Sequence, residues 1–271
     1  MLPLGAIHGG TSMGPFTGLT ALVTGASGGI GRATSHALAD AGASVAINDL
    51  DDATLGKLAA EIEDTGQACL RLPGNLTEPE TVKQVTDSVI SEWGRLDILV
   101  NAAGICPSRP IENTTVEEWD QVFAVNVKAM FLCCREAISH MAGQGGGSIV
   151  NIASNAAKTA EPLIVPYSAS KFAVVGLTQG LALELADRRI RVNCVCPAMC
   201  ETEMMERLAV DYARLHGETV EDCKRSFHAE IPWGRMARPA DVAHAICFLG
   251  NPESEFFTGQ ALNVSGGLEM H

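Results

Sequence analysis

A hydroxyl, a phenol and an amine lie close together in one short part of this sequence. They belong to Ser154, Tyr167 and Lys171. If a helix begins near Tyr167, Lys171 lies one turn further along the same helix face. An ammonium group near a phenol favours the phenolate and lowers a pKa that is normally about 10. Such a pair can take a proton from an alcohol or give one to a carbonyl.

The pattern Tyr-x-x-x-Lys is weak by itself, because a tyrosine that anchors a surface helix has the same spacing. Two features favour chemistry. The chain has only two tyrosines, and Tyr167 stands between a strand-like and a helix-like segment. The apolar run 172–177 predicts a well-packed helix, and Ser154 at the end of the preceding strand can hydrogen-bond the same oxygen.

Strand-like and helix-like segments alternate along most of the chain. Strands without polar alternation, separated by helices, are typical of a parallel sheet covered on both faces. We therefore predict one α/β domain over residues 18–271, with no linker or composition break. Strands are expected at 20–23, 44–48, 68–72, 96–100, 148–152, 191–195 and 261–264, and helices from the glycine loop to about Asp40, at 52–65, ending at Trp93, at 116–141 and from Tyr167 onward.

Three glycines follow the first expected strand and precede a helix. Gly25, Gly29 and Gly31 have the spacing G-x-x-x-G-x-G. Glycines there allow a tight turn and close approach of a pyrophosphate, which binds at the helix N-terminus. A glycine cluster can also be an ordinary loop, but the strand–turn–helix context favours a dinucleotide site.

Asp49 ends the second expected strand. A carboxylate at this place can accept hydrogen bonds from the adenosine ribose hydroxyls and repels a 2′-phosphate. Neither Asn48 nor Leu50 is basic, and the glycine loop has no arginine before Arg32. The sequence thus predicts NAD rather than NADP, although Asp49 could also be a plain turn residue.

Charge and cysteine usage exclude several classes of protein. A formal net charge of −13 should repel nucleic acid and anionic membranes, so neither is an expected partner. Nine cysteines, irregularly spaced and mostly in apolar runs, predict reduced thiols and a cytoplasmic protein. The run Cys194-x-Cys196-x-x-x-Cys200 could indicate a metal, but no further pair completes a site, and we predict none.

The first 17 residues do not have the features of a signal peptide, because the first lysine or arginine is Arg32. We expect residues 1–17 to be a flexible leader. No apolar run in the sequence approaches the length that spans a membrane.

The motifs occur in an ordered set that resembles the short-chain dehydrogenase/reductase family over about 19–267. The set comprises Thr24-Gly25-x-x-x-Gly29-x-Gly31, Asn101-Ala-Ala-Gly104, Asn126, Ser154, Tyr167-x-x-x-Lys171, Pro197 and Thr202. The resemblance implies a Rossmann-type doubly wound sheet of seven parallel strands. It also implies hydride transfer with a nicotinamide cofactor, and the family's habit of forming oligomers, mostly tetramers.

The resemblance gives roles to single residues. It makes Tyr167 the general acid/base, Ser154 the group that orients the substrate oxygen, and Lys171 the residue that lowers the tyrosine pKa and binds the nicotinamide ribose. Asn126 would hold the water of a proton relay. The implied cofactor contacts are Gly25, Ser27, Gly29, Ile30, Gly31, Asp49, Asn75, Leu76, Asn101, Gly104, Tyr167, Lys171, Pro197, Cys200 and Thr202.

Other interpretations of these residues remain open. Asn126 could cap a helix kink, and Ser154 could be a turn residue, with Ser168 or Ser170 as neighbouring hydroxyls. Three positions also depart from the family pattern. Asn75 replaces an aspartate that binds adenine, although its amide oxygen can still accept that bond; Ala198 replaces a glycine after Pro197; and Ser265 replaces an aspartate.

The segment 202–235, which we call the lid segment, is expected to cover the substrate. It is rich in methionine and glutamate, and it resembles the corresponding part of the family's polyol and diol dehydrogenases. We expect an NAD-dependent dehydrogenase of a small secondary alcohol, polyol or sugar. The alternatives are an NADPH-dependent 3-oxoacyl thioester reductase and, from another class, a non-catalytic cofactor-sensing protein.

Overall fold

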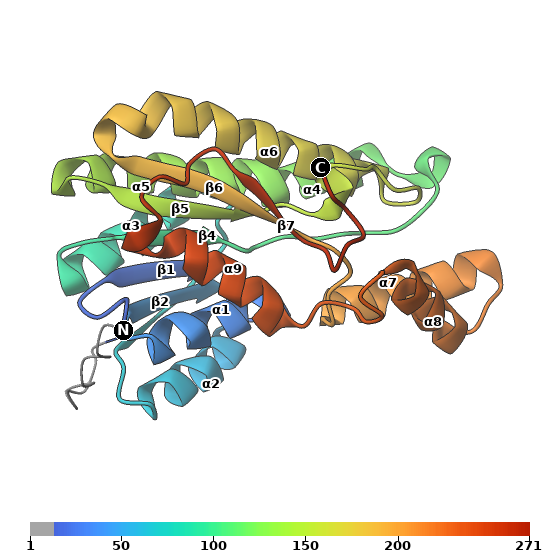
Figure 1. The fold of residues 1–271 in the computed structure, drawn as a ribbon, viewed down its shortest axis with the longest axis horizontal. Coiled ribbons are helices and arrows are strands. Elements are labelled where there is room, and N and C mark those ends of the chain that lie inside the picture. The colour runs from blue at the N-terminus through green and yellow to red at the C-terminus, as the bar shows by residue number, and fades with distance from the viewer. Residues whose placement is uncertain (1–13) are drawn as a thin grey trace, which may run out of the picture.

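The computed structural model describes residues 14–271, and these form one parallel sheet between two layers of helices (Figure 1). The strand order is β3-β2-β1-β4-β5-β6-β7. The predicted fold class is thus confirmed. Because the chain runs outward from β1 in one direction and from β4 in the other, the two central strands mark the switch point where ligands bind. The strands are β1 (Thr20–Thr24), β2 (Ser44–Asp49), β3 (Cys69–Pro73), β4 (Ile98–Asn101), β5 (Gly147–Ile152), β6 (Ile190–Pro197) and β7 (Ala261–Val264).

The helices divide between the two faces of the sheet according to their apolar sides. On one face pack α1 (Gly29–Asp40), α2 (Asp52–Glu63) and α9 (Pro239–Gly250). On the other face pack α3 (Pro79–Trp93), α5 (Ala129–Gln144) and α6 (Val165–Leu185). Both faces of the sheet are covered, which is why its central strands are continuous apolar runs.

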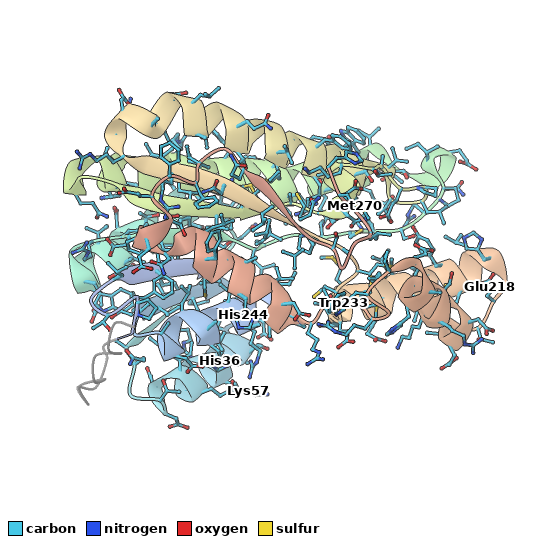
Figure 2. All side chains as sticks on the ribbon, in the orientation of Figure 1. His36, Lys57, Glu218, Trp233, His244 and Met270 are labelled. Carbon is cyan, nitrogen blue, oxygen red and sulfur yellow. The ribbon has the colours of Figure 1, made fainter. Side chains whose placement is uncertain are left out.

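The lid segment folds into α7 (Glu203–His216) and α8 (Val220–Glu230), which project from one end of the sheet (Figure 1). Glu218, in the connection between the two helices, marks the tip of this projection (Figure 2). The pair has a small core of its own, formed by Ala209, Ala213, Cys223, Phe227, Ile231 and Met236. These two helices were not predicted from the sequence.

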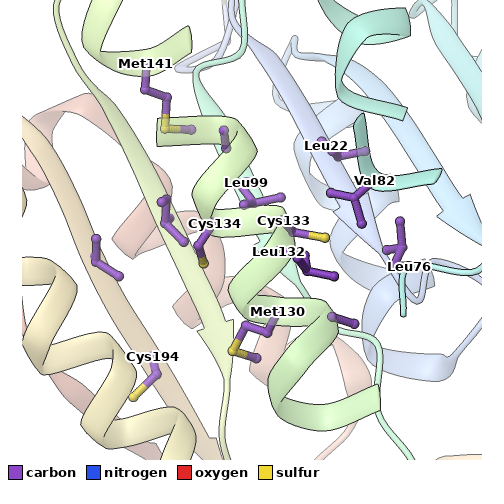
Figure 3. Close-up of a cluster of buried hydrophobic side chains, with 14 of the residues drawn as sticks. Leu22, Leu76, Val82, Leu99, Met130, Leu132, Cys133, Cys134, Met141 and Cys194 are labelled. Atoms are coloured by element: carbon purple, nitrogen blue, oxygen red, sulfur yellow. The ribbon is translucent and has the colours of Figure 1, made fainter. Parts of the chain in front are cut away.

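Several cysteines are packing residues of the core beneath α5 and α6. Cys133, Cys134 and Cys194 belong to the same buried cluster as Leu99 and Met130 (Figure 3). Burial raises the pKa of the Cys134 thiol to about 12, so it remains protonated at neutral pH. These cysteines fill apolar space, as their position in buried runs predicted.

The helix predicted over 116–141 is interrupted. The structure has α4 (Val116–Phe123), then one π-helical turn (Ala124–Lys128), then α5. A π turn inserts an extra residue and is frequent at functional sites. Here it contains Asn126, which is fully buried.

The predicted leader is partly outside the described residues, since nothing is described for 1–13. Residues 14–17 form a turn, and Phe16 is buried among the side chains beneath α1 and α2. The Phe16 N–H donates to the Ala41 carbonyl at 3.0 Å, so the folded part begins before residue 18. Among the helices of 14–271, none combines the length and the apolar character that a membrane crossing requires.

Candidate active site

Two cavities meet at the carboxyl ends of the central strands. The first, of about 460 Å³, lies along the glycine loop and Asp49, and we call it the cofactor cavity. The second, of about 770 Å³, contains Ser154, Tyr167 and Lys171, and we call it the substrate cavity. Both are lined by Ile30, Ala102, Gly104, Thr202 and Met204. A ligand in one cavity can therefore react with a ligand in the other.

Steric constraints explain the glycines of the loop. Gly25 has φ +63°, and a Cβ there would lie 2.6 Å from the backbone of Ala103. A Cβ on Gly31 would lie 2.2 Å from the Gly25 carbonyl oxygen. Neither position can accept a side chain without moving the backbone. The loop is thereby held tight between β1 and the start of α1.

The cofactor cavity fits a dinucleotide. Ser27 Oγ is buried and has no hydrogen-bond partner among the described residues, which is a costly arrangement unless a ligand supplies one. The Asp49 carboxylate accepts from the N–H groups of Ser27 at 2.9 Å and Leu50 at 2.7 Å. It is thus fixed at the end of β2, where the adenosine ribose of a dinucleotide would be held.

Two of the predicted cofactor contacts look different in the structure. Asn75 Oδ1 already accepts from the Thr77 N–H at 3.1 Å and from the Thr77 hydroxyl at 2.9 Å, so the expected acceptor for adenine is occupied. Asn101 does not line the cofactor cavity, because its side chain is turned into the core. There its Nδ2 donates to Asn151 Oδ1 at 2.9 Å. Leu76 lines the cavity as predicted.

The structure brings Ser154, Tyr167 and Lys171 together as the spacing predicted. Helix α6 begins at Val165, so Tyr167 and Lys171 occupy its first turns on one face. The Lys171 ammonium lies 5.5 Å from the centroid of the Tyr167 ring and donates to the Ile152 carbonyl at 2.7 Å. Ser154 follows the end of β5 and borders the same cavity.

Burial dominates the electrostatics of this group. It raises the pKa of Tyr167, because the phenolate loses its hydration, and the Ser154 hydroxyl opposes the shift. The pKa of Lys171 is lowered to about 8 for the same reason. In the chain by itself, burial thus outweighs the lowering of the Tyr167 pKa that we expected from Lys171.

The Asn126 side chain is occupied by structural contacts. Its Oδ1 accepts from the Ile105 N–H at 2.9 Å, and its Nδ2 donates to the Ile105 carbonyl at 3.0 Å and to Ser170 Oγ at 3.0 Å. Asn126 thus fastens the loop after β4 to the π turn and to α6. Neither Ser168 nor Ser170 lines the substrate cavity, in contrast to Ser154.

Pro197, Cys200 and Thr202, which the family resemblance makes cofactor contacts, border the substrate cavity, and Thr202 also lines the cofactor cavity. Ser265 is buried and closes a turn, since its hydroxyl donates to the Glu269 carbonyl at 2.8 Å. That turn sends residues 268–271 along the cavity wall.

Sequence reasoning missed several polar groups of the substrate cavity. Asn155, Glu161 and Glu230 line it from three different elements. Glu161 stands six residues before Tyr167, but nothing in that spacing indicates which way its side chain points. In the described part of the chain, no group of three or more His, Cys, Asp or Glu residues is arranged to bind a metal ion.

Several known proteins are similar to this chain in sequence and in fold. A family model described as short chain dehydrogenase matches residues 19–213. The 3-oxoacyl-(acyl-carrier-protein) reductase FabG of Thermotoga maritima is 37% identical over 258 residues, covering 93% of this chain and 98% of the relative. The sorbitol dehydrogenase of Cereibacter sphaeroides is 36% identical over 254 residues, again covering 93% and 98%.

The fold agrees with a solved structure as well. The actinorhodin polyketide ketoreductase, crystallised with NADPH, matches with a TM-score of 0.91 and 32% identity, covering 93% of this chain and 98% of that one. The two relatives and this solved structure each match 93% of the chain. The chain belongs to the short-chain dehydrogenase/reductase family, whose members are oxidoreductases that bind a nicotinamide cofactor.

Proposed function

We propose that the protein is an NAD-dependent dehydrogenase that interconverts a small secondary alcohol, polyol or sugar and its ketone. The observation that carries this proposal is the Asp49 carboxylate, fixed by two backbone N–H groups in the cofactor cavity. It offers acceptors to ribose hydroxyls and would repel a 2′-phosphate. Among the residues that line this cavity, the one lysine or arginine is Arg207 on α7, which is paired with Glu203.

The residues would divide the chemistry between them. When bound, NAD would supply the hydride acceptor for the alcohol carbon, and Tyr167, as the phenolate, would accept the hydroxyl proton at its phenolic oxygen. Ser154 would orient the substrate oxygen, and Lys171 would hold the nicotinamide ribose and favour the phenolate. The positive charge of the oxidised nicotinamide would work against the burial that raises the Tyr167 pKa.

A second candidate is an NADPH-dependent 3-oxoacyl thioester reductase, which is favoured by the similarity to the Thermotoga reductase. The charges of the lid segment argue against it. Every lysine and arginine of the segment forms an ion pair with a nearby carboxylate. These residues are Arg207, Arg214, Lys224, Arg225 and Arg235. Little positive charge is left to attract an acidic carrier protein.

A substrate panel separates the candidates. Initial rates of NADH formation would be measured with diols, polyols and simple secondary alcohols, and NADPH consumption with a 3-oxoacyl thioester. We expect turnover with NAD and at least one polyol or diol. Efficient reduction of the thioester with NADPH, together with no oxidation of any of the alcohols, would favour the second candidate. Cofactor binding without turnover of any compound would support the non-catalytic alternative.

A further inference from the structure

One carboxylate in the substrate cavity has no part in the proposed proton and hydride transfer. Glu161 borders the same cavity as Ser154 and Tyr167 and is partly buried. Burial raises its pKa, while a hydrogen bond from Asn155 opposes the shift. A carboxylate in such a place is normally paired with a cation. Within 14–271, however, no lysine, arginine or histidine forms an ion pair with it.

The two oxygens of this carboxylate differ. Oε1 accepts from Asn155 Nδ2 at 2.7 Å. The Oδ1 of the same amide accepts a hydrogen bond from the Ser154 hydroxyl at 3.2 Å. Glu161 is therefore two hydrogen bonds away from the hydroxyl that would orient the substrate. Its Oε2 accepts no hydrogen bond from the described residues, which leaves it available to a ligand.

The turn that carries Glu161 is held in a strained conformation. Leu163 has φ +64°, a value that non-glycine residues adopt only when their surroundings impose it. The Leu163 carbonyl accepts from the Arg109 N–H at 2.8 Å, and the Pro162 carbonyl accepts from the Tyr212 hydroxyl at 3.0 Å. Contacts from two other parts of the chain thus fix the backbone beside Glu161, and the Asn155 amide holds its side chain.

We infer that Glu161 is a specificity-determining residue that accepts, through Oε2, a hydrogen bond from a second donor on the substrate. That donor is a hydroxyl or a protonated amine close to the reacting carbon. The inference rests on the proposed function, because it takes Ser154 and Tyr167 as the groups at that carbon. A site with such an acceptor rejects analogues that lack the donor, since the acceptor then remains unpaired.

Three substrates on one carbon skeleton test this inference. They are the butanol with its hydroxyl on the second carbon, the vicinal butanediol and the vicinal amino-butanol. With NAD, the wild-type kcat/KM should favour a donor-bearing compound over the butanol by about 10- to 100-fold, as for a hydrogen bond to a charged group. Glu161→Ala should remove this preference. Glu161→Gln keeps a neutral acceptor, so it should retain part of a preference for the diol and lose one for the amine.

A matched control is Glu218→Gln, which removes the same charge at the exposed tip of the lid segment (Figure 2). Its discrimination should equal that of the wild type. The same ratio in the wild type and in Glu161→Ala would overturn the inference, as would a wild type that does not discriminate at all.

Binding separates this inference from the proposed function. If no alcohol is oxidised, the proposed function fails. The role of Glu161 is then tested by calorimetric titration of the three compounds into the enzyme–NADH complex. Tighter binding of the diol or the amino alcohol than of the butanol in the wild type, but not in Glu161→Ala, supports the inference. Equal affinities in both proteins contradict it.

Discussion

The proposed mechanism makes the phenol of Tyr167 the group that exchanges a proton with the substrate. Tyr167→Phe removes only that oxygen, so we expect kcat/KM for alcohol oxidation to fall about 100- to 10,000-fold. The affinity for NADH, measured by fluorescence, should change less than about threefold, because the cofactor cavity is intact. Ser139→Ala is the control, since its exposed hydroxyl lies outside both cavities and donates only to the Glu136 carbonyl. Similar losses in both variants would remove Tyr167 from its proposed role.

The ionisation of the tyrosines can be measured without any substrate. Burial raises the pKa of both Tyr167 and Tyr212, the two tyrosines of the chain. We expect the ultraviolet absorbance of tyrosinate to stay low at pH 10 in the native protein, whereas the unfolded chain ionises near that pH. Because the unfolded state releases these protons first, the free energy of unfolding should fall as the pH rises above about 10. A native transition at or below pH 10 would show that burial does not dominate.

Asp49 is expected to decide the choice between the two nicotinamide cofactors. Asp49→Ala removes the ribose acceptors and the repulsion of a 2′-phosphate together. The ratio of kcat/KM for NAD to that for NADP should then fall at least about tenfold, the effect of losing a hydrogen bond to a charged group. Asp52→Ala is the control, because it removes an exposed carboxylate near the cavity that is paired with Arg71. An unchanged ratio in Asp49→Ala, or a wild type that prefers NADP, would contradict the assignment.

At the scale of elements, the turn from β1 into α1 must keep its glycines. Gly31→Ala places a Cβ 2.2 Å from the Gly25 carbonyl oxygen, so we expect weaker NADH binding and a lower Tm, with a cost of about 1–3 kcal/mol for overpacking. Gly28→Ala is the matched control, because a Cβ there lies 3.4 Å from the same oxygen and φ is −73°. A Gly31→Ala protein that binds NADH and melts like Gly28→Ala would show that the loop tolerates a side chain.

The sequence predicted most elements because buried parallel strands appear as continuous apolar runs. Such a run at 44–48 became β2, and only the strand ends moved by a few residues, as in β6. The π turn was not predicted, since its Asn126 bonds the backbone of Ile105, 21 residues away, and no local pattern indicates that contact. The same holds for Glu161, whose carboxylate is held by Asn155 and whose neighbouring backbone is held by Arg109 and Tyr212.

At the scale of the whole molecule, the cofactor cavity and the substrate cavity adjoin, since five residues line both of them. Strands on both sides of the switch point end at these cavities, which is how Asp49 at the end of β2 and Ser154 after β5 come to line adjoining spaces. The sequence motifs predicted this meeting of the two sites. The sequence did not predict the acidic part of the substrate cavity, because Glu161 and Glu230 come together only in the folded chain.

Hydride transfer between ligands in the two adjoining cavities is measured most directly with deuterium. Wild-type protein would be incubated with NAD and a diol deuterated at its secondary carbon, and the reduced cofactor analysed by mass spectrometry. We predict that deuterium appears in NADH and that kcat/KM for the deuterated diol is lower than for the protiated one. Reduced cofactor without deuterium would contradict the proposed reaction, as would oxidation of a 3-hydroxyacyl thioester with NADP but of no diol with NAD.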